Sequence, residues 1–166
     1  MPDVNIEKLY DLAGDEVVKL AEELYNLKHY LTEQYEIKDF LTDYTKEEPA
    51  RRGVLLRLLK NASPLLKELV TVLGEDFLRE FSSITEGLVS LVEERKNVKF
   101  VKITTAFPLE PEELEKIAGT CGVKVKYNVV VDPELLGGFI INYADSRVFD
   151  GGIRGQLLKL RMEIMK

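Results

Sequence analysis

The stretch Val98-Lys-Phe-Val-Lys-Ile-Thr-Thr-Ala-Phe107 decides the fold, because the pattern of the whole chain changes there. Its residues are mostly β-branched or aromatic with polar side chains interspersed, which is typical of a β-strand. Pro108 follows directly and predicts the end of that strand. The sequence before it has a helical period instead, so we expect a domain boundary at residues 95–98.

Upstream of this stretch, residues 1–95 have the pattern of helices throughout. Apolar residues recur at helical spacing, as in the run from Val17 to Leu31. Gly14 and Gly74 are typical helix stops, and Ser63-Pro64 is a start signal because Ser caps free backbone N–H groups. Each helix has a single apolar stripe that must be buried against the others, which predicts an all-α helical bundle.

Downstream, strands and helices alternate on a shorter scale. The expected elements are a short helix after Pro111, a strand from Val123 to Val131, strands at 139–143 and 147–149, and a final helix from Ile153 to about Met165. The sequence therefore predicts an α+β fold. An N-terminal helical bundle (residues 1–95) is followed by a small β-α-β-β-β-α domain (residues 98–166).

The charge of the chain is negative and unevenly spread. Its formal net charge is −6; residues 1–95 carry 12 basic and 20 acidic side chains, whereas residues 96–166 carry 11 basic and 9 acidic ones. Opposite signs favour two modules with different partners, although a chance distribution of surface charge gives the same numbers. A negative chain without a dense Lys/Arg run repels polyanions, so we expect no nucleic-acid partner.

The chain has no segment of the kind that enters a membrane. No uninterrupted apolar run approaches the roughly 20 residues that a transmembrane helix needs. The N-terminal sequence MPDVNIEKLYDLAGDE is polar and acidic, unlike a secretory signal or an Arg-rich transit peptide. We expect no targeting peptide and no direct membrane insertion.

Residues for catalysis or metal binding are scarce. His29 and Cys121 are the only His and Cys, and they lie in different halves. A structural zinc site needs about four nitrogen or sulfur ligands, so the count excludes one. Carboxylate pairs such as Glu22-Glu23 are adjacent and point about 100° apart on a helix, which does not make an acid/base pair. We expect no catalytic residue, no metal and no cofactor.

One glycine-rich segment leaves an alternative open. Gly151-Gly-Ile-Arg-Gly155 precedes the final helix, where backbone N–H groups can bind an anion. It lacks the Lys-Ser/Thr of a P-loop and does not open a βαβ unit. A tight strand-to-helix turn capped by Asp150 explains the same glycines, so an anion-binding or ligand-binding α/β module is the alternative interpretation.

Three segments, in order, resemble the delta subunit of F-type ATP synthase, known in mitochondria as the oligomycin-sensitivity-conferring protein. They are Ile103-Thr-Thr-Ala-Phe-Pro-Leu109, Asp132-Pro-Glu-Leu-Leu-Gly-Gly-Phe-Ile-Ile-Asn142, and Asp150-Gly-Gly-Ile-Arg-Gly-Gln-Leu157 with Leu160-Arg161. The signature residues are Asp132, Leu135, Gly137, Gly138, Asp150, Arg154 and Gly155. Their expected roles are structural: turns, a return of the chain into the sheet and a helix cap.

The resemblance implies a non-catalytic subunit of the peripheral stalk, the stator of a rotary ATPase, without a cofactor. The stator stops the catalytic hexamer from turning with the rotor, so that proton-driven rotation yields ATP synthesis. The helical bundle of the family holds N-terminal segments of the F1 alpha subunits, and its C-terminal part binds the stalk b subunits. The implied location is the cytoplasmic face of the cell membrane, as a peripheral protein of bacterial type.

Apolar residues of the first, sixth and final expected helices are the candidates for partner binding. They are Leu9, Tyr10, Ala13, Phe77, Phe81, Leu157 and Leu160. The first helix is shorter than the family pattern, of which only Leu9 to Ala13 match the end. A stalk subunit of a vacuolar-type ATPase is a further alternative that would keep the mechanical role and change the partners.

Overall fold

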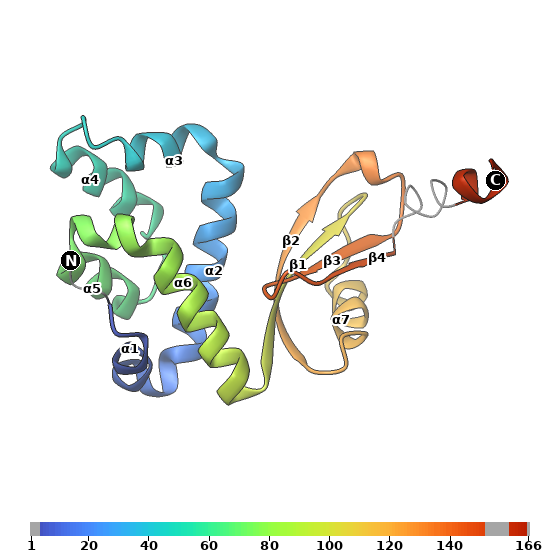
Figure 1. The fold of residues 1–166 in the computed structure, drawn as a ribbon, viewed down its shortest axis with the longest axis horizontal. Coiled ribbons are helices and arrows are strands. Elements are labelled where there is room, and N and C mark those ends of the chain that lie inside the picture. The colour runs from blue at the N-terminus through green and yellow to red at the C-terminus, as the bar shows by residue number, and fades with distance from the viewer. Residues whose placement is uncertain (1–3, 152–159, 166) are drawn as a thin grey trace. The chain divides into compact units, whose positions relative to one another are not determined.

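The computed structural model of the protein describes residues 4–151 and 160–165. Residue contacts divide the chain into two compact units, Met1–Val92 and Glu93–Lys166. Unit 1 is helical and unit 2 contains a four-stranded sheet (Figure 1). The predicted α+β class, with helices first and a small mixed domain second, is confirmed.

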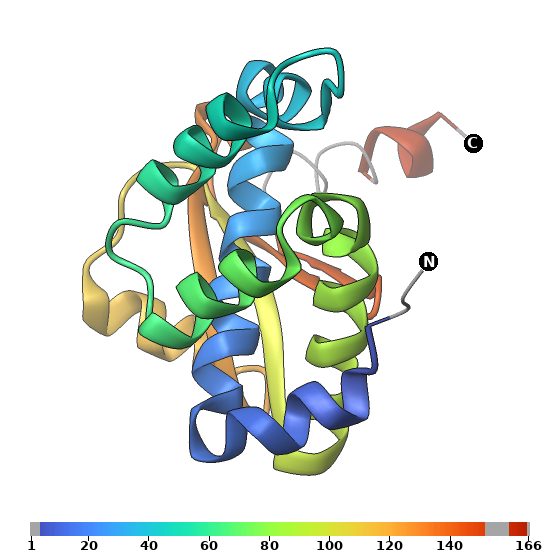
Figure 2. The same ribbon diagram turned by 90° about the vertical axis from the view of Figure 1, so that its left-hand side faces the viewer.

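Unit 1 is built from a series of helices joined by short turns. They are α1 (Ile6–Ala13), the 3-10 turn η1 (Gly14–Glu16), α2 (Val17–Glu33), α3 (Tyr35–Thr42), α4 (Glu48–Leu58), α5 (Pro64–Leu73) and α6 (Glu75–Lys96). In both Figure 1 and Figure 2, α1 lies across one end of the bundle formed by the longer α2 and α6.

Local signals set the helix ends as the sequence predicted. The Ser63 side chain accepts a hydrogen bond from the Leu66 backbone N–H at the start of α5, and Pro64 occupies the first helical position. Gly14 and Gly74 end their helices with φ angles of 55° and 56°, in a region that favours glycine. These helix ends follow from residues within one turn of each boundary.

The core of unit 1 consists of the predicted apolar stripes. The largest fully buried side chains of the unit come from α2 to α6: Leu20, Leu24, Leu41, Leu55, Leu66, Phe77, Ile84 and Leu88. At the end where α1 crosses, Gly87 of α6 leaves space for Ile6, because a Cβ added to Gly87 would lie 3.0 Å from Ile6 Cγ1. Burial of these stripes supplies the main stabilisation of the unit.

Unit 2 follows the predicted order of strands and helices. Its elements are β1 (Val98–Thr105), α7 (Pro111–Gly119), β2 (Lys124–Val131), the 3-10 turn η2 (Pro133–Leu135), β3 (Phe139–Tyr143) and β4 (Val148–Asp150). The strand β1 ends two residues before the predicted Phe107. There the Thr105 hydroxyl donates to the Phe107 carbonyl at 3.0 Å and the chain bends toward Pro108.

The sheet has the order β2-β1-β3-β4. The strands β1 and β2 are parallel and connected through α7, whereas β3 pairs antiparallel with both β1 and β4. Figure 1 shows α7 against one face of this sheet. Val101, Ile103 and Ile141 form the buried centre of that face, with Ile117 of α7 packed on them.

In the last described segment, 160–165, residues 160–164 are helical. The Met165 backbone N–H donates to the Arg161 carbonyl at 3.1 Å, as in a helical turn. The predicted helix beginning at Ile153 has its first residues among 152–159, which lie outside the described residues.

Candidate functional site

The described residues provide no metal centre. Among residues 4–151 and 160–165, no group of three or more His, Cys, Asp or Glu side chains is placed to hold a metal ion. The ring of His29 lies edge-on to Tyr25, with 4.4 Å between centroids. A hydrogen bond with the Cys121 thiol, together with burial, raises the pKa of Tyr143. His29 and Cys121 thus each have an aromatic neighbour within their own unit.

The described residues also lack a membrane-spanning helix. Within the described ranges, none of the helices combines the length and the apolar character required to cross a bilayer.

The Asp132–Asn142 segment forms a tight turn between two strands. The Asp132 carboxylate accepts a hydrogen bond from the Glu134 backbone N–H at 3.0 Å, and the Asp132 N–H donates to the Thr105 carbonyl at 2.7 Å. Leu135 is buried, and Gly138 has a φ of 74° that favours glycine. These residues bring the chain back into the sheet at β3.

The segment that starts at Asp150 begins at the end of the edge strand β4. Asp150 is exposed, and the Gly151 backbone N–H donates to the Phe139 carbonyl at 2.9 Å. A Cβ at Gly151 would lie 3.2 Å from that carbonyl and 3.2 Å from the Phe149 ring, which itself stacks on Phe139. Close packing therefore explains the glycine at position 151.

Arg154, Gly155 and Leu157 lie outside the described residues, as does most of the proposed anion loop. The capping role expected for Asp150 also involves those residues. The anion-binding alternative gains no support from the residues that are described.

The predicted partner-binding residues have different environments. Phe77 is completely buried, and Leu9 and Ala13 are also buried in the core of unit 1. Tyr10 and Phe81 are half-buried, and Leu160 is exposed in unit 2. Residues on the main apolar stripe of a helix thus serve mostly to hold the bundle together.

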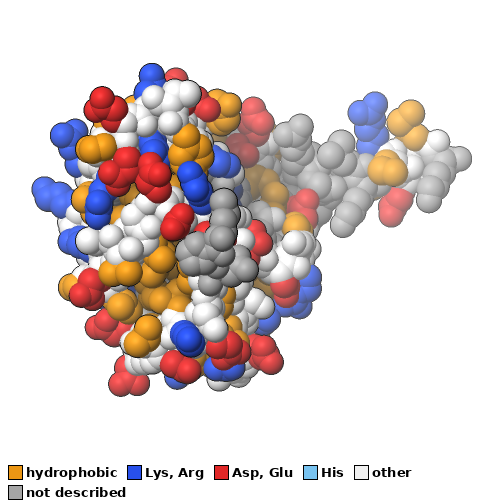
Figure 3. Space-filling model, turned by 60° about the vertical axis from the view of Figure 1, so that its left-hand side comes forward, with side chains coloured by type: hydrophobic (Ala, Val, Ile, Leu, Met, Phe, Trp, Pro, Cys, Tyr) orange, Lys and Arg blue, Asp and Glu red, His pale blue; other side chains and the backbone are white. Residues whose placement is uncertain are grey.

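Other apolar residues of unit 1 are much more accessible. Leu12 on α1 is 82% exposed and Val72 on α5 is 79% exposed. Figures 1 and 2 both show α5 beside α1, and Figure 3 shows apolar side chains gathered among charged ones on the helical unit. We call Leu12 and Val72 the α1–α5 surface. They lie off the buried stripe of their helices, so the helical period of the sequence did not single them out.

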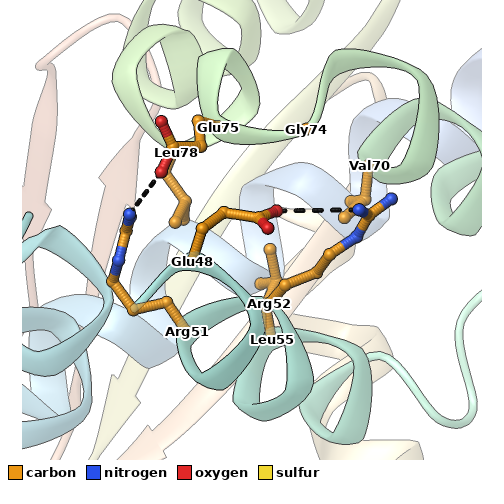
Figure 4. Close-up of a pocket in the computed structure, with 8 residues that line it drawn as sticks. All are labelled: Glu48, Arg51, Arg52, Leu55, Val70, Gly74, Glu75 and Leu78. Atoms are coloured by element: carbon orange, nitrogen blue, oxygen red, sulfur yellow. Dashed lines mark hydrogen bonds and ion pairs between the residues drawn. The ribbon is translucent and has the colours of Figure 1, made fainter. Parts of the chain in front are cut away.

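A buried arginine ties α4 to α6. Arg51 is only 2% exposed; its Nη2 lies 2.5 Å from Glu75 Oε1, and its guanidinium carbon lies 4.9 Å from the centre of the Tyr44 ring. Figure 4 shows the pair at the edge of a small pocket, where Arg52 also faces Glu48 at 3.6 Å. The cavity of about 10 Å³ holds no more than about one water molecule, so this is a structural contact.

A larger cleft lies between α2, α3 and α6. Its volume is about 170 Å³, and its lining includes the apolar residues Leu31, Leu41 and Phe81. The basic residues Lys28, Lys38 and Arg79 also line it. We call this feature the α2–α3–α6 cleft. It was not identified from the sequence, because the lining residues are brought together from three helices.

Fold and surfaces together define the class of protein. The chain is a two-unit α+β protein whose helical unit exposes large apolar side chains. A family model described as "ATP synthase delta (OSCP) subunit" matches residues 7–164. The chain belongs to this family and is a peripheral-stalk subunit of an F-type ATP synthase, as the resemblance implied.

Named relatives agree with this assignment. The chain is 26% identical to an ATP synthase subunit delta of Acetivibrio thermocellus, over 89% of this chain and 86% of that protein. It is 24% identical to an ATP synthase subunit delta of Prochlorococcus marinus, over 91% and 86% of the two chains. Both relatives are named as delta subunits of ATP synthase, and the match covers most of their length. This disfavours the alternative of a vacuolar-type stalk subunit.

A solved structure has the same fold. A chain of the Toxoplasma gondii mitochondrial ATP synthase hexamer superposes with a TM-score of 0.54 and is 15% identical in sequence. The match covers 97% of this chain and 95% of that chain. At this level of sequence identity, the superposition shows that the two chains share a fold.

Proposed function

We propose that this subunit is the non-catalytic connector of the stalk. Unit 1 holds N-terminal segments of the F1 alpha subunits, and unit 2 holds the stalk b subunits. The observation that carries the proposal is the exposure of Leu12 and Val72. A partner that covers these large apolar side chains removes them from water, which stabilises the complex. A connector needs such surfaces on both of its units.

On unit 1, the proposed binding site for alpha segments is the α1–α5 surface. We propose that Leu12 and Val72 face the same side of unit 1, so that an amphipathic helix laid on α1 and α5 covers both. Tyr10 is half-buried and lies two residues before Leu12, so its side chain points to another side of α1 and is not part of this surface. Leu9, Ala13 and Phe77 act indirectly, because they are buried and hold α1 and α6 in place.

On unit 2, the proposed b-binding site includes the last described turn. Leu160 and Ile164 are exposed and four residues apart, so they lie on one face of a helix. Val148 and Phe149 of the edge strand β4 are exposed as well. We propose that the helical b subunits cover the Leu160–Ile164 face, for which apolar residues at this spacing are suited.

The proposed role is mechanical. Torque on the catalytic hexamer is resisted only if the two binding surfaces stay attached while the rotor turns. Apolar contacts would hold over a wide range of ionic strength because salt does not screen them, unlike exposed ion pairs. The protein would work at the cytoplasmic face of the membrane, attached through its partners.

Proton pumping by membrane vesicles tests the function. Vesicles that contain the proton channel and stalk b subunits, but lack this subunit, are mixed with F1 and then given ATP. Adding this chain should restore ATP-driven proton uptake, because the stator is then complete. Restored ATP hydrolysis without proton uptake, or uptake that does not depend on the chain, would contradict the proposal.

A further inference from the structure

The α2–α3–α6 cleft has a shape and chemistry that the proposed function does not use. Leu31 and Leu41 are buried at its base, and Phe81 is half-buried along it. Its volume of about 170 Å³ is below the roughly 300–1,000 Å³ of a typical small-molecule site. An apolar cavity of about 150 Å³ accommodates benzene, so this cleft has room for one bulky apolar side chain.

The polar groups of the cleft are mainly cationic. Lys38 of α3 forms no ion pair within the part of the chain that the structure describes. Arg79 of α6 forms none there either, and its guanidinium carbon lies 5.1 Å from the centre of the Tyr44 ring. Lys28 of α2 already donates to Glu86 at 2.8 Å. Two cations at the cleft are thus free to meet carboxylates.

The hydroxyl groups of the cleft are occupied. Thr32 donates to the Lys28 carbonyl at 2.8 Å, and Thr42 donates to the Lys38 carbonyl at 2.9 Å. Recognition by the cleft therefore depends on the apolar base and on the positive charges. The positive charge of the cleft contrasts with residues 1–95 as a whole, which carry 20 acidic and 12 basic side chains.

We propose that the α2–α3–α6 cleft is a second docking site of unit 1, for an acidic protein segment. The segment inserts one bulky apolar side chain above Leu31 and Leu41, and its flanking carboxylates pair with Lys38 and Arg79. Charge complementarity selects the partner, and the apolar side chain provides an anchor. The proposal takes from the proposed function only that the partners of this subunit are proteins.

The test uses the full chain and a designed probe. The probe is the labelled peptide acetyl-Glu-Asp-Phe-Glu-Asp-amide, and fluorescence anisotropy measures its binding. One control peptide replaces Phe by Ala, and another replaces the four acidic residues by Lys. The acidic Phe peptide should bind, and both controls should bind at least about tenfold more weakly. Equal binding of the Lys peptide would overturn the proposal, and equal binding of the Ala peptide would reduce the cleft to an anion site.

Charge-reversal variants locate the binding. The double substitution K38E/R79E should weaken the acidic Phe peptide by about tenfold, since attraction becomes repulsion at two positions. The matched control Lys19→Glu reverses an exposed charge of α2 that does not line the cleft and should leave binding unchanged. The milder K38Q/R79Q variant should give an intermediate loss, and circular dichroism checks that each variant is folded. An equal effect of K19E and K38E/R79E would contradict the proposal.

The α1–α5 surface provides an independent comparison. L12E/V72E should leave binding of the acidic Phe peptide unchanged, because neither residue lines the cleft. K38E/R79E should in turn leave binding of an alpha-subunit segment at the α1–α5 surface unchanged. If the acidic Phe peptide does not bind, the second docking site is rejected and the connector role is not. If the alpha-subunit segment does not bind, the binding site proposed for it on unit 1 is rejected and the second docking site is not.

Discussion

The carboxylate of Glu23 on α2 accepts two hydrogen bonds from Ser63, the residue that caps α5. The Ser63 backbone N–H donates to Oε1 at 2.7 Å, and its hydroxyl donates to Oε2 at 2.6 Å. The carboxylate thus lies at the positive end of the α5 dipole, where negative charge is stabilising. Because α5 carries half of the α1–α5 surface, this contact positions Val72 relative to the long helix α2.

Removing this carboxylate should destabilise unit 1. Glu23→Ala leaves the N–H and hydroxyl of the buried Ser63 without their acceptor, so we expect a loss of about 1–3 kcal/mol in the free energy of unfolding. Urea unfolding followed by circular dichroism measures it. Glu68→Ala, at an exposed position on α5, is the control and should change stability by less than about 0.5 kcal/mol. Equal losses in the two variants would mean that the Glu23–Ser63 contact is not stabilising.

The close approach of α1 and α6 makes Gly87 sensitive to added volume. Gly87→Leu should push Ile6 away and loosen α1, because a Cβ at position 87 would already lie 3.0 Å from Ile6 Cγ1. Hydrogen exchange should then become faster in α1. Gly53→Leu is the matched control in α4, where a Cβ meets nothing within 4 Å. It should be neutral or stabilising by up to about 1 kcal/mol, since glycine is a poor helix former. Unchanged exchange in α1 of G87L would contradict the packing described here.

Glu86 should contribute to the acid sensitivity of unit 1. The hydrogen bond and the charge of Lys28 lower the pKa of Glu86 below its ordinary value of 4.5. A carboxyl group with a lowered pKa stabilises the fold above its unfolded pKa, and this contribution is lost as the pH falls through the folded value. Since Glu86 is largely exposed, the contribution should be a few tenths of a kcal/mol.

The double-mutant cycle of Lys28 and Glu86 measures that contribution. Glu86→Gln and Lys28→Met should each reduce the difference in unfolding free energy between about pH 6 and about pH 3. The double variant should show no further reduction, because both changes remove the same contact. Additive reductions would indicate that the two residues act separately.

Leu136 should be an unfavourable residue at its position in unit 2. It is exposed and has a φ of 67°, a left-handed conformation that is strained for leucine. Leu136→Gly should therefore raise the stability of unit 2 by up to about 1 kcal/mol, as seen by thermal unfolding. Leu136→Ala keeps the Cβ and should bring no such gain. A stability loss in L136G would show that the exposed leucine makes a contact that outweighs the strain.

Most of the fold could be predicted because its signals are local. Ser63 and Gly74 mark helix ends within one turn of themselves, and alternating apolar residues mark β2. The pairing of β1 between β2 and β3 could not be predicted in this way, because it joins segments far apart in the chain. The end of β1 was placed too late, since the hydrogen bond of Thr105 with Phe107 bends a sequence that still has strand character.

The binding surfaces were harder to predict than the fold. Helical periodicity identifies the residues on the main apolar stripe, and Phe77 and Leu9 on that stripe are buried. Leu12 and Val72 lie off the stripe, where a single apolar residue gives no periodic signal. The α2–α3–α6 cleft depends on how three helices pack, so its lining residues have no common pattern in the sequence.

The central claim is that unit 1 holds an alpha-subunit segment on its α1–α5 surface. Isothermal titration of a peptide copying an alpha-subunit N-terminus into the full chain tests it most directly, with wild type, L12E/V72E and the exposed control Tyr35→Glu. We expect wild type and Y35E to bind alike, L12E/V72E to lose binding, and wild-type binding to persist when the salt is raised to about 1 M. Unchanged binding by L12E/V72E, or loss of wild-type binding in high salt, would contradict the account.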